Sequence, residues 1–239
     1  MSRPVPLNNI DHAGLRVIPA RGAAYGDAAM FAPVFPYEFR NVQAHYPIVF
    51  IRERTGGYRP VALFGLEEGQ NLFLNESGWD APYLPMAVRM APFLIGLADD
   101  GREKRFEVHI DLDHPRVSTT QGDPIFLEQG GHSPLLRDVS ALLSDIHNGE
   151  QSVRPFCALL DELGLIEPFT LDIELDDGTK GRLAGYYTIA EEALYALSAE
   201  QLGRLQAAGA LQPVYMAVAS LSQMLSIIAR RNRRAGGAA

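Results

Sequence analysis

The chain has 239 residues, enough for one large domain with a sizeable core, and its 29 acidic against 21 basic side chains give a formal charge of −8. Because a phosphate backbone rewards clustered positive charge, this balance argues against a nucleic-acid-binding protein. An apolar fraction of 47% argues against wholesale disorder, and a single cysteine excludes an intramolecular disulfide and a Cys-rich zinc site.

The first 30 residues are rich in Gly, Ala, Pro and Arg and show no sustained hydrophobic period, which predicts a loosely ordered N-terminal arm over 1–30. The segment 1–7 lacks the long apolar run of a signal peptide. The most apolar stretch, 214–229, is interrupted by serines and a glutamine, so we expect no transmembrane segment. Together these features predict a cytoplasmic protein.

Three pairs of β-rich runs, each pair joined by turn residues, predict three antiparallel hairpins. The turns fall at 54–58, 99–102 and 176–179, and a short run at 71–74 can extend the first hairpin into a meander. The paired runs are 47–53 with 59–65, 92–97 with 105–112, and 169–175 with 182–187.

Helical patterns begin in the middle of the chain. Ser133 followed by proline predicts a helix start, an apolar stripe follows, and Asn148-Gly149 predicts its end. A shorter helix is expected from Pro155 to Leu163. It contains Cys157, for which a buried small hydrophobe is the simplest interpretation.

The last part of the chain is predicted to be helical throughout. Capping boxes at Thr188/Glu191 and Ser198/Gln201 predict two helix starts, and Gly209 predicts a stop. A final helix is expected over 213–231, with one apolar face and a basic end at 230–234. That end fits a core helix with a favourable dipole, and it also fits a partner-binding or a membrane-surface helix. The expected apolar face consists of Val214, Val218, Leu221, Leu225 and Ile228.

These elements predict an α+β fold with antiparallel hairpins in the N-terminal two-thirds packed with amphipathic helices in the C-terminal part. We expect a single domain over 31–231 and a frayed tail over 232–239.

One candidate site is a metal centre on the second strand of the middle hairpin. His109 and Asp111 are two residues apart, so their side chains share one face, as a 2-His-1-carboxylate iron site requires. His132 or His147 would supply the second histidine. The opposing interpretation is a solvated strand end, since the jelly-roll strand pattern of such iron sites is absent. Iron is predicted only under this alternative; otherwise we expect no cofactor and no catalytic residue.

A second candidate site is an aromatic pocket formed by Trp79, Tyr83, Arg89 and Phe93. The arginine could clasp the carboxylate of a ligand between aromatic walls. The alternative is that these residues close one end of the sheet as part of the core.

Several sequence runs, taken in their order and spacing, resemble the SapC family of bacterial proteins. The resemblance extends from about residue 31 onward and includes Trp79 with Tyr83-Leu84-Pro85, followed by Arg89 and Pro92-Phe93. The other runs are 46–50, 60–66, 69–73, Gly122 with 125–126, 185–186, 209–211, 214–215 and 220–221.

The resemblance implies a role more than a reaction. The family is named after a protein associated with a bacterial paracrystalline surface layer, and its members are often encoded near tryptophan-halogenase-like proteins, cupin-like proteins and outer-membrane receptors. It supplies no catalytic residues to carry over.

We therefore expect a non-enzymatic accessory or interaction protein linked to surface-layer or envelope functions. Its partner would be a surface-layer, envelope or halogenase-like protein, and an oligomer is possible. One alternative is an enzyme or specificity subunit that works with a halogenase-like or cupin-like oxygenase. Another is a small-molecule or peptide-binding protein that uses the aromatic and arginine pocket.

Overall fold

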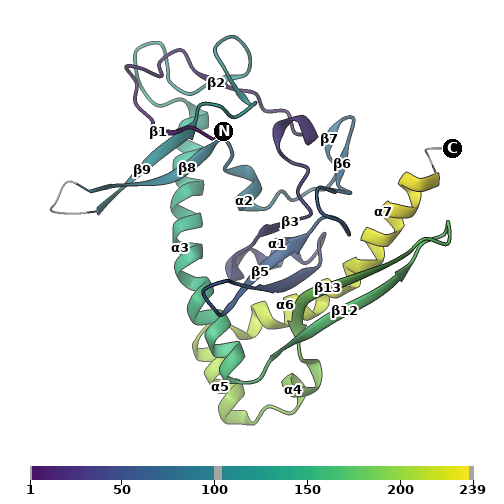
Figure 1. Ribbon diagram of the computed structural model, residues 1–239. Helices are drawn as coiled ribbons and strands as arrows, with labels where there is room; N and C mark the ends of the chain where they lie inside the picture. Colours follow the sequence, from purple (N-terminus) through teal and green to yellow (C-terminus); the bar gives the residue numbers. More distant parts are fainter. Residues whose placement is uncertain (1, 100–103, 237–239) are drawn as a thin grey trace.

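A five-stranded antiparallel sheet lies at the centre of the computed structural model, which describes residues 2–99 and 104–236 (Figure 1). The strand order is β12–β13–β4–β5–β3. The bounds are β3 Phe31–Pro33, β4 Ile48–Arg52, β5 Tyr58–Leu63, β12 Ile166–Glu174 and β13 Lys180–Ile189. The mixture of antiparallel sheets and helices confirms the predicted α+β class.

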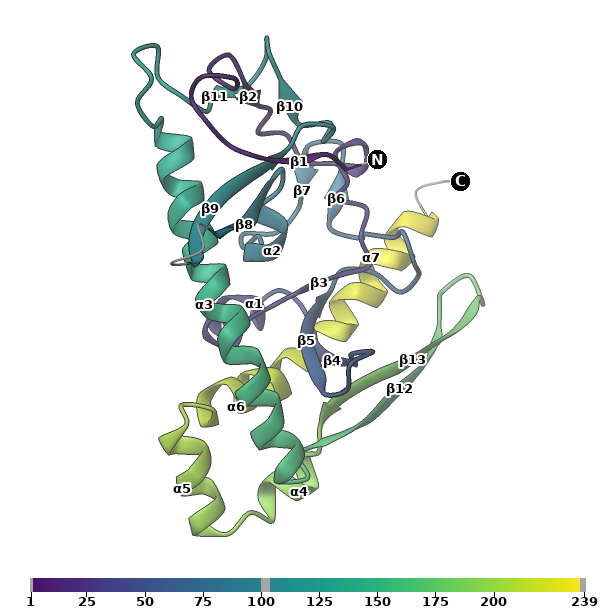
Figure 2. The same ribbon diagram turned by 60° about the vertical axis from the view of Figure 1, so that its left-hand side comes forward.

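The first and third predicted hairpins are confirmed as β4–β5 and β12–β13. In β4 the consecutive residues Ile48, Val49 and Phe50 are all fully buried, because both faces of the strand are covered. Strand β12 instead alternates: Ile173 is buried, while its neighbours Asp172 and Glu174 are exposed. The β12–β13 hairpin extends beyond the rest of the sheet and lies beside the C-terminal helix (Figures 1 and 2).

The middle hairpin is confirmed as β8 Phe93–Asp99 with β9 Lys104–Asp111, and its turn lies largely outside the described residues. Ile110 of β9 is fully buried but Phe106, on the same face, is 45% exposed, so this face is buried only toward one end of the strand. The run 71–74 does not extend the first meander. It leads into a separate ribbon of β6 Leu74–Asn75 and β7 Gly78–Trp79.

The segment predicted as a loose arm contributes strands to two further sheets. Strand β1, Pro4–Pro6, pairs with β9, and Leu7 N donates to Val108 O at 2.8 Å. Strand β2, Arg16–Val17, pairs with β10 Val117–Ser118 and β11 Asp123–Pro124. Strands of two or three residues are too short to show a hydrophobic period, so no sequence pattern indicated them.

A single helix, α3 Pro134–Glu162, replaces the two helices predicted in the middle of the chain. Its start is confirmed, since Ser133 Oγ accepts from Leu136 N. The predicted stop at Asn148-Gly149 is wrong, and the helix also continues through Pro155. One buried stripe runs along its length with members seven residues apart: Ile146, Val153 and Leu160.

Gly149 is needed for side-chain packing and does not end the helix. A Cβ placed on Gly149 would lie 2.6 Å from Cγ of Phe35, so the glycine lets the buried Phe35 ring approach the helix. Phe35 immediately precedes a 3-10 turn, η2 Pro36–Glu38, which leads into α1 Phe39–Val42. The remaining short elements are η1 Ala23–Tyr25 and α2 Met86–Arg89.

Two of the three predicted signals before the last helix are confirmed. Ser198 and Gln201 form a capping box at the start of α5 Ala199–Ala207, and Gly209 adopts φ 67° after it. The box at Thr188 and Glu191 is wrong. Thr188 remains in β13, and α4 Glu191–Tyr195 is preceded by Ala190.

The predicted final helix is divided into α6 Leu211–Ser220, the 3-10 turn η3 Leu221–Gln223, and α7 Met224–Gly236. A 3-10 turn advances about 120° per residue against about 100° for an α-helix, so η3 rotates the helix face that follows it. Consequently Met224 and Ile227 are buried, while Leu225 of the predicted apolar face is 74% exposed.

Among the described residues, the stretch from Leu211 to Gly236 is long and apolar enough to be a candidate membrane span, and 33% of its most apolar window is buried inside the fold. Ser220 fixes this stretch to the sheet, since its Oγ accepts from Ile48 N at 2.8 Å and donates to Ala217 O. A core helix passes the same composition test, so the finding carries no further conclusion.

Candidate functional site

Trp79 and Tyr83 are joined through Tyr46, and Tyr83 continues the chain of hydrogen bonds to Glu38. Trp79 Nε1 donates to the hydroxyl of Tyr46 at 2.8 Å, and that hydroxyl donates to the carbonyl of Tyr83. The Tyr83 hydroxyl donates to Glu38 Oε2 at 2.7 Å. Their polar atoms therefore satisfy one another within the fold.

The other two residues of the predicted aromatic pocket have separate surroundings. Phe93 is 2% exposed and belongs to the core. Arg89 accepts, through its carbonyl, a hydrogen bond from Arg21, and its charge acts on Glu38. Thus Tyr83 bonds Glu38 directly, Arg89 acts on Glu38 through its charge, and Phe93 belongs to the core. A ligand pocket made by all four residues stays a prediction.

Glu38 is the residue in this region that sequence reasoning missed. Its side chain is 1% exposed, and it accepts from Phe35 N, Met86 N and the Tyr83 hydroxyl at 2.7–3.2 Å. Burial raises the pKa of this carboxyl, while the three hydrogen bonds and Arg89 lower it in part. Glu38 thereby joins η2 to α2. No local pattern around residues 36–38 signals a contact so distant in sequence.

The residues of the predicted metal site each contact a different part of the structure. Asp111 accepts from the hydroxyl of Ser2 and from Arg3 N, both at 2.7 Å, and these bonds hold its pKa below the usual range. His109 packs on Gly96 of β8, where an added Cβ would lie 2.1 Å from the imidazole. His132 forms a β-bridge with Phe126.

The alternative histidine, His147, contacts Phe106 edge-on at 4.2 Å between ring centroids. Across residues 2–99 and 104–236, no three His, Cys, Asp or Glu side chains are grouped to hold a metal ion. The described structure therefore does not bring His109, Asp111 and a second histidine together. Iron binding stays a prediction.

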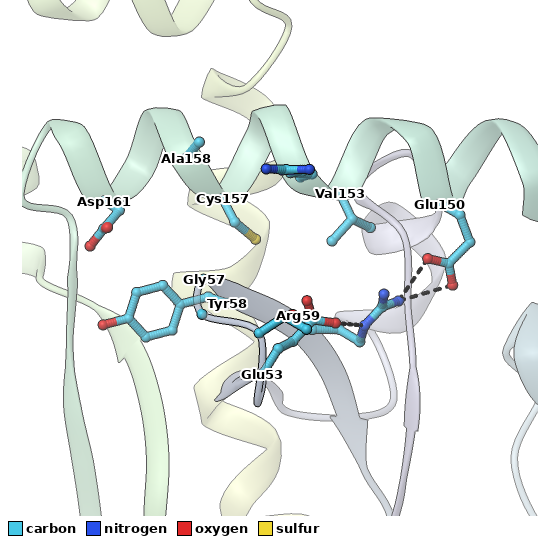
Figure 3. Close-up of a pocket in the computed structure, with 12 residues that line it drawn as sticks. Glu53, Gly57, Tyr58, Arg59, Glu150, Val153, Cys157, Ala158 and Asp161 are labelled. Atoms are coloured by element: carbon cyan, nitrogen blue, oxygen red, sulfur yellow. Dashed lines mark hydrogen bonds and ion pairs between the residues drawn. The ribbon is translucent and has the colours of Figure 1, made fainter.

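A cavity of about 620 Å³ lies between the β4–β5 turn and the second half of α3 (Figure 3). We call it the hairpin cavity. The turn contributes Glu53 and residues 55–59, and the helix contributes Glu150, residues 153–154 and 157–158, and Asp161. None of these residues was singled out as a binding residue from the sequence, because the two elements are far apart along the chain.

An ion-pair network occupies one end of the hairpin cavity. Arg59 Nε donates to Glu53 Oε1 at 2.6 Å, and Arg59 Nη1 lies 2.9 Å from both carboxylate oxygens of Glu150. Burial by itself would lower the pKa of Arg59, but the two carboxylates outweigh it and hold the pKa above its usual value. The Arg59 charge is therefore neutralised within the protein.

Cys157 lies on the helical wall of the cavity with its sulfur toward the hairpin (Figure 3). It is buried, which confirms the simplest interpretation of this residue. Burial raises the pKa of the thiol to about 12, with Arg59 lowering it and Glu53 and Asp161 raising it. The sulfur is consequently a protonated, weakly polar part of the wall at neutral pH rather than a nucleophile.

The other end of the cavity is formed by Tyr58, Asp161 and the turn glycines. The Tyr58 ring packs edge-on against Tyr187 at 4.9 Å, and Figure 3 shows it below Asp161. Gly56 and Gly57 have φ of 87° and 84°, and no atom lies within 4 Å of where their Cβ atoms would be. The turn therefore presents bare backbone to the cavity.

A second hollow, of about 520 Å³, lies between η2–α1, α3 and the start of α6. We call it the helix groove. Its polar edge includes Arg40 and Gln212, and its Tyr37 is 48% exposed, stacks on Phe35 and donates to the carbonyl of Asp145 at 2.8 Å. The apolar lining consists of Pro36, Tyr37, Pro155, Phe156, Pro213 and Met216.

Comparison with known proteins gives one family. Residues 7–227 match the family model described as SapC, which covers most of the chain and agrees with the resemblance seen in the sequence. No curated protein and no solved structure matches.

Proposed function

The chain belongs to the SapC family, and from this premise we propose that it is a non-enzymatic accessory protein that acts by binding a protein partner, linked to surface-layer or envelope functions in bacteria. The observation that carries the proposal is the helix groove, an open apolar hollow to which three separate parts of the chain contribute. Burial of apolar surface drives most protein association, so such a hollow is suited to a partner's side chain.

The side chains of the groove are of the kinds that are enriched at protein interfaces. Tyr37 offers a ring held in place by stacking on Phe35 and by its hydrogen bond to the carbonyl of Asp145. Phe156 is held by an edge contact with Phe39 at 5.9 Å. Met216 adds an adaptable thioether. Two rings fixed before binding lose little conformational freedom when a partner arrives.

Charge at the groove edge specifies the partner further. Arg40 lines the groove, and none of the ion pairs among residues 2–99 and 104–236 involves it. A guanidinium without an internal carboxylate favours a partner that supplies one. The partner segment therefore presents an apolar side chain beside an Asp or Glu.

The test compares the wild-type chain with Met216→Lys and Arg40→Glu. Each is used to recover a stoichiometric partner from the native bacterium, and the partner is then purified and titrated calorimetrically. We expect each substitution to weaken binding about tenfold or more, since one puts a cation into the apolar hollow and the other repels the partner's carboxylate.

Leu225→Lys is the matched control, because Leu225 is an exposed apolar residue on α7 that does not line the groove. It should bind the partner with wild-type affinity. Recovery of no stoichiometric partner would contradict the accessory role. A partner held equally well by all four proteins would contradict the groove as its binding site.

A further inference from the structure

We propose that the hairpin cavity binds a short peptide with both ends free, a dipeptide or tripeptide, whose amino group contacts Asp161 and whose carboxylate contacts Arg154. This site shares no lining residue with the helix groove, so the inference does not depend on the protein partner.

The first argument is the spacing of the two charges on α3. Arg154 and Asp161 are seven residues apart, which places them two turns apart on one face of the helix and about 10.5 Å apart along its axis. Cys157 and Ala158 lie between them on the same face and also line the cavity. The helix therefore presents a cation and an anion at the two ends of a neutral stripe.

The second argument is that these two charges remain after the internal pairing is complete. Arg59 is neutralised by Glu53 and Glu150. In the part of the chain that the structure describes, neither Arg154 nor Asp161 takes part in an ion pair. A zwitterion can satisfy both at once, whereas an amine or a carboxylate alone leaves one of them without a partner.

The walls between the charges suit a peptide. Val153 and the protonated Cys157 are buried and give an apolar floor. Across the cavity, Gly56 N and Gly57 O are already paired with Glu53 within the turn, so a peptide unit would bond to Gly56 O or Gly57 N, and the Tyr58 ring can cover a side chain.

The length of the site sets the size of the ligand. An extended dipeptide spans about 7 Å, and a charge-assisted hydrogen bond adds about 2.8 Å at each end. That total is about 2 Å longer than the axial separation of Arg154 and Asp161, a difference that their side chains can span, and a tripeptide is the upper limit. The cavity volume of about 620 Å³ also suits a small ligand.

The experiment tests whether each charged end of the peptide depends on one charged side chain of the protein. The full-length protein is titrated calorimetrically with alanyl-leucine and alanyl-alanyl-leucine, with their N-acetyl forms, and with their C-terminal amides. For the wild type we expect each cap to weaken binding of at least one peptide about tenfold, the effect of losing one charged hydrogen bond. In Asp161→Asn the acetyl cap should have almost no effect, and in Arg154→Gln the amide cap should have almost no effect.

Glu162→Gln and Arg182→Gln are the matched controls. Glu162 neighbours Asp161 but pairs with Arg204, and Arg182 is an exposed cation on β13 that does not line the cavity. Both should retain the full effect of both caps. The four variants change only exposed residues. Far-ultraviolet circular dichroism of all five proteins is used to check that each is folded before titration.

Three results would overturn the inference. The first is wild-type affinity weaker than about 1 mM for both free peptides. The second is a cap that weakens binding equally in the wild type and in the variant without the matching protein charge, Asp161→Asn for the acetyl cap or Arg154→Gln for the amide cap. The third is binding of the amide as tight as that of the free peptide, which would show recognition of the amine alone. None of these results bears on the groove titration, so the two proposals fail separately.

Discussion

Glu38 shows how a single side chain can hold two elements that no local pattern connects. Its carboxylate accepts from a backbone amide of its own turn and from a hydroxyl and an amide of residues 83–86. A buried carboxylate is costly unless its oxygens are hydrogen-bonded, and three donors meet that requirement here. The cost that remains appears as a raised pKa.

The raised pKa of Glu38 predicts a pH-dependent stability. Because the folded state holds this proton more tightly than the unfolded chain, its contribution to the free energy of unfolding is greatest below about pH 4.5. It decreases as the pH rises through the folded-state pKa, by at most about 1.4 kcal/mol per pH unit. Glu38→Gln cannot titrate and should lack this decrease.

The measurement is urea unfolding of the wild type and of Glu38→Gln between pH 4 and 8. The free energy of unfolding of the wild type, minus that of the variant, should decrease with rising pH. Curves that stay parallel over the whole range would show that Glu38 has an ordinary pKa. Other titrating groups affect both proteins equally and cancel in the difference.

At the scale of elements, the hairpins were predictable because their signals are local. Each consists of two β-rich runs with Gly and polar turn residues between them, and β4–β5, β8–β9 and β12–β13 all form. The continuity of α3 was not predictable. Asn148-Gly149 is typical of a helix stop, but the glycine is required by the ring of Phe35, a contact with a distant part of the chain.

The same limit applies to the candidate site. Residues 58–59 were placed correctly beside or within a strand, but their relation to α3 depends on tertiary packing. The pairing of Arg59 with Glu150 joins residues 91 apart in sequence. Periodicity reports which face of an element is apolar, and it does not report which other element covers that face. The hairpin cavity and the helix groove were both invisible for this reason.

Because Phe35 approaches α3 closely, we expect a glycine-to-alanine change in this helix to destabilise the protein, the opposite of the usual effect. Gly→Ala inside a helix normally stabilises by up to about 1 kcal/mol. At Gly149 the new Cβ would lie 2.6 Å from Cγ of Phe35, so Gly149→Ala should lower the free energy of unfolding by about 1–3 kcal/mol.

Gly203 is the matched control, since it is an exposed glycine inside α5, and a methyl group added there would have no atom within 4 Å. Gly203→Ala should stabilise the protein, with thermal unfolding as the measurement for both variants. Equal effects at the two positions would show that Phe35 moves aside without cost.

At the scale of the whole molecule, both ends of the described chain are attached to its body. Near the start, strand β1 pairs with β9. Near the end, Nη1 of Arg230 in α7 lies 2.7 Å from Asp80 Oδ2, and Cζ of the same residue lies 4.2 Å from the centroid of the Phe73 ring. Much of the basic end that sequence analysis left open is therefore engaged internally. Arg231 also lies 4.0 Å from Glu67.

Attachment of the N-terminal segment can be measured directly by hydrogen exchange. The amide of Leu7 donates to Val108 O at 2.8 Å, so we expect it to exchange at least about tenfold more slowly than in an unfolded peptide of the same sequence. The loosely ordered arm that the sequence predicted would instead exchange at the unfolded rate. Asp111→Ala, which removes the acceptor of Ser2 and Arg3, should bring the Leu7 amide closer to that rate.

The packing of His109 on Gly96 limits which substitutions the β8–β9 hairpin accepts. The imidazole fills the volume that a side chain on the neighbouring strand would otherwise use, since a methyl group there would overlap the ring. A side chain added at residue 96 would have to displace the imidazole or be matched by a smaller residue at position 109, so the two positions are coupled across the β8–β9 ladder.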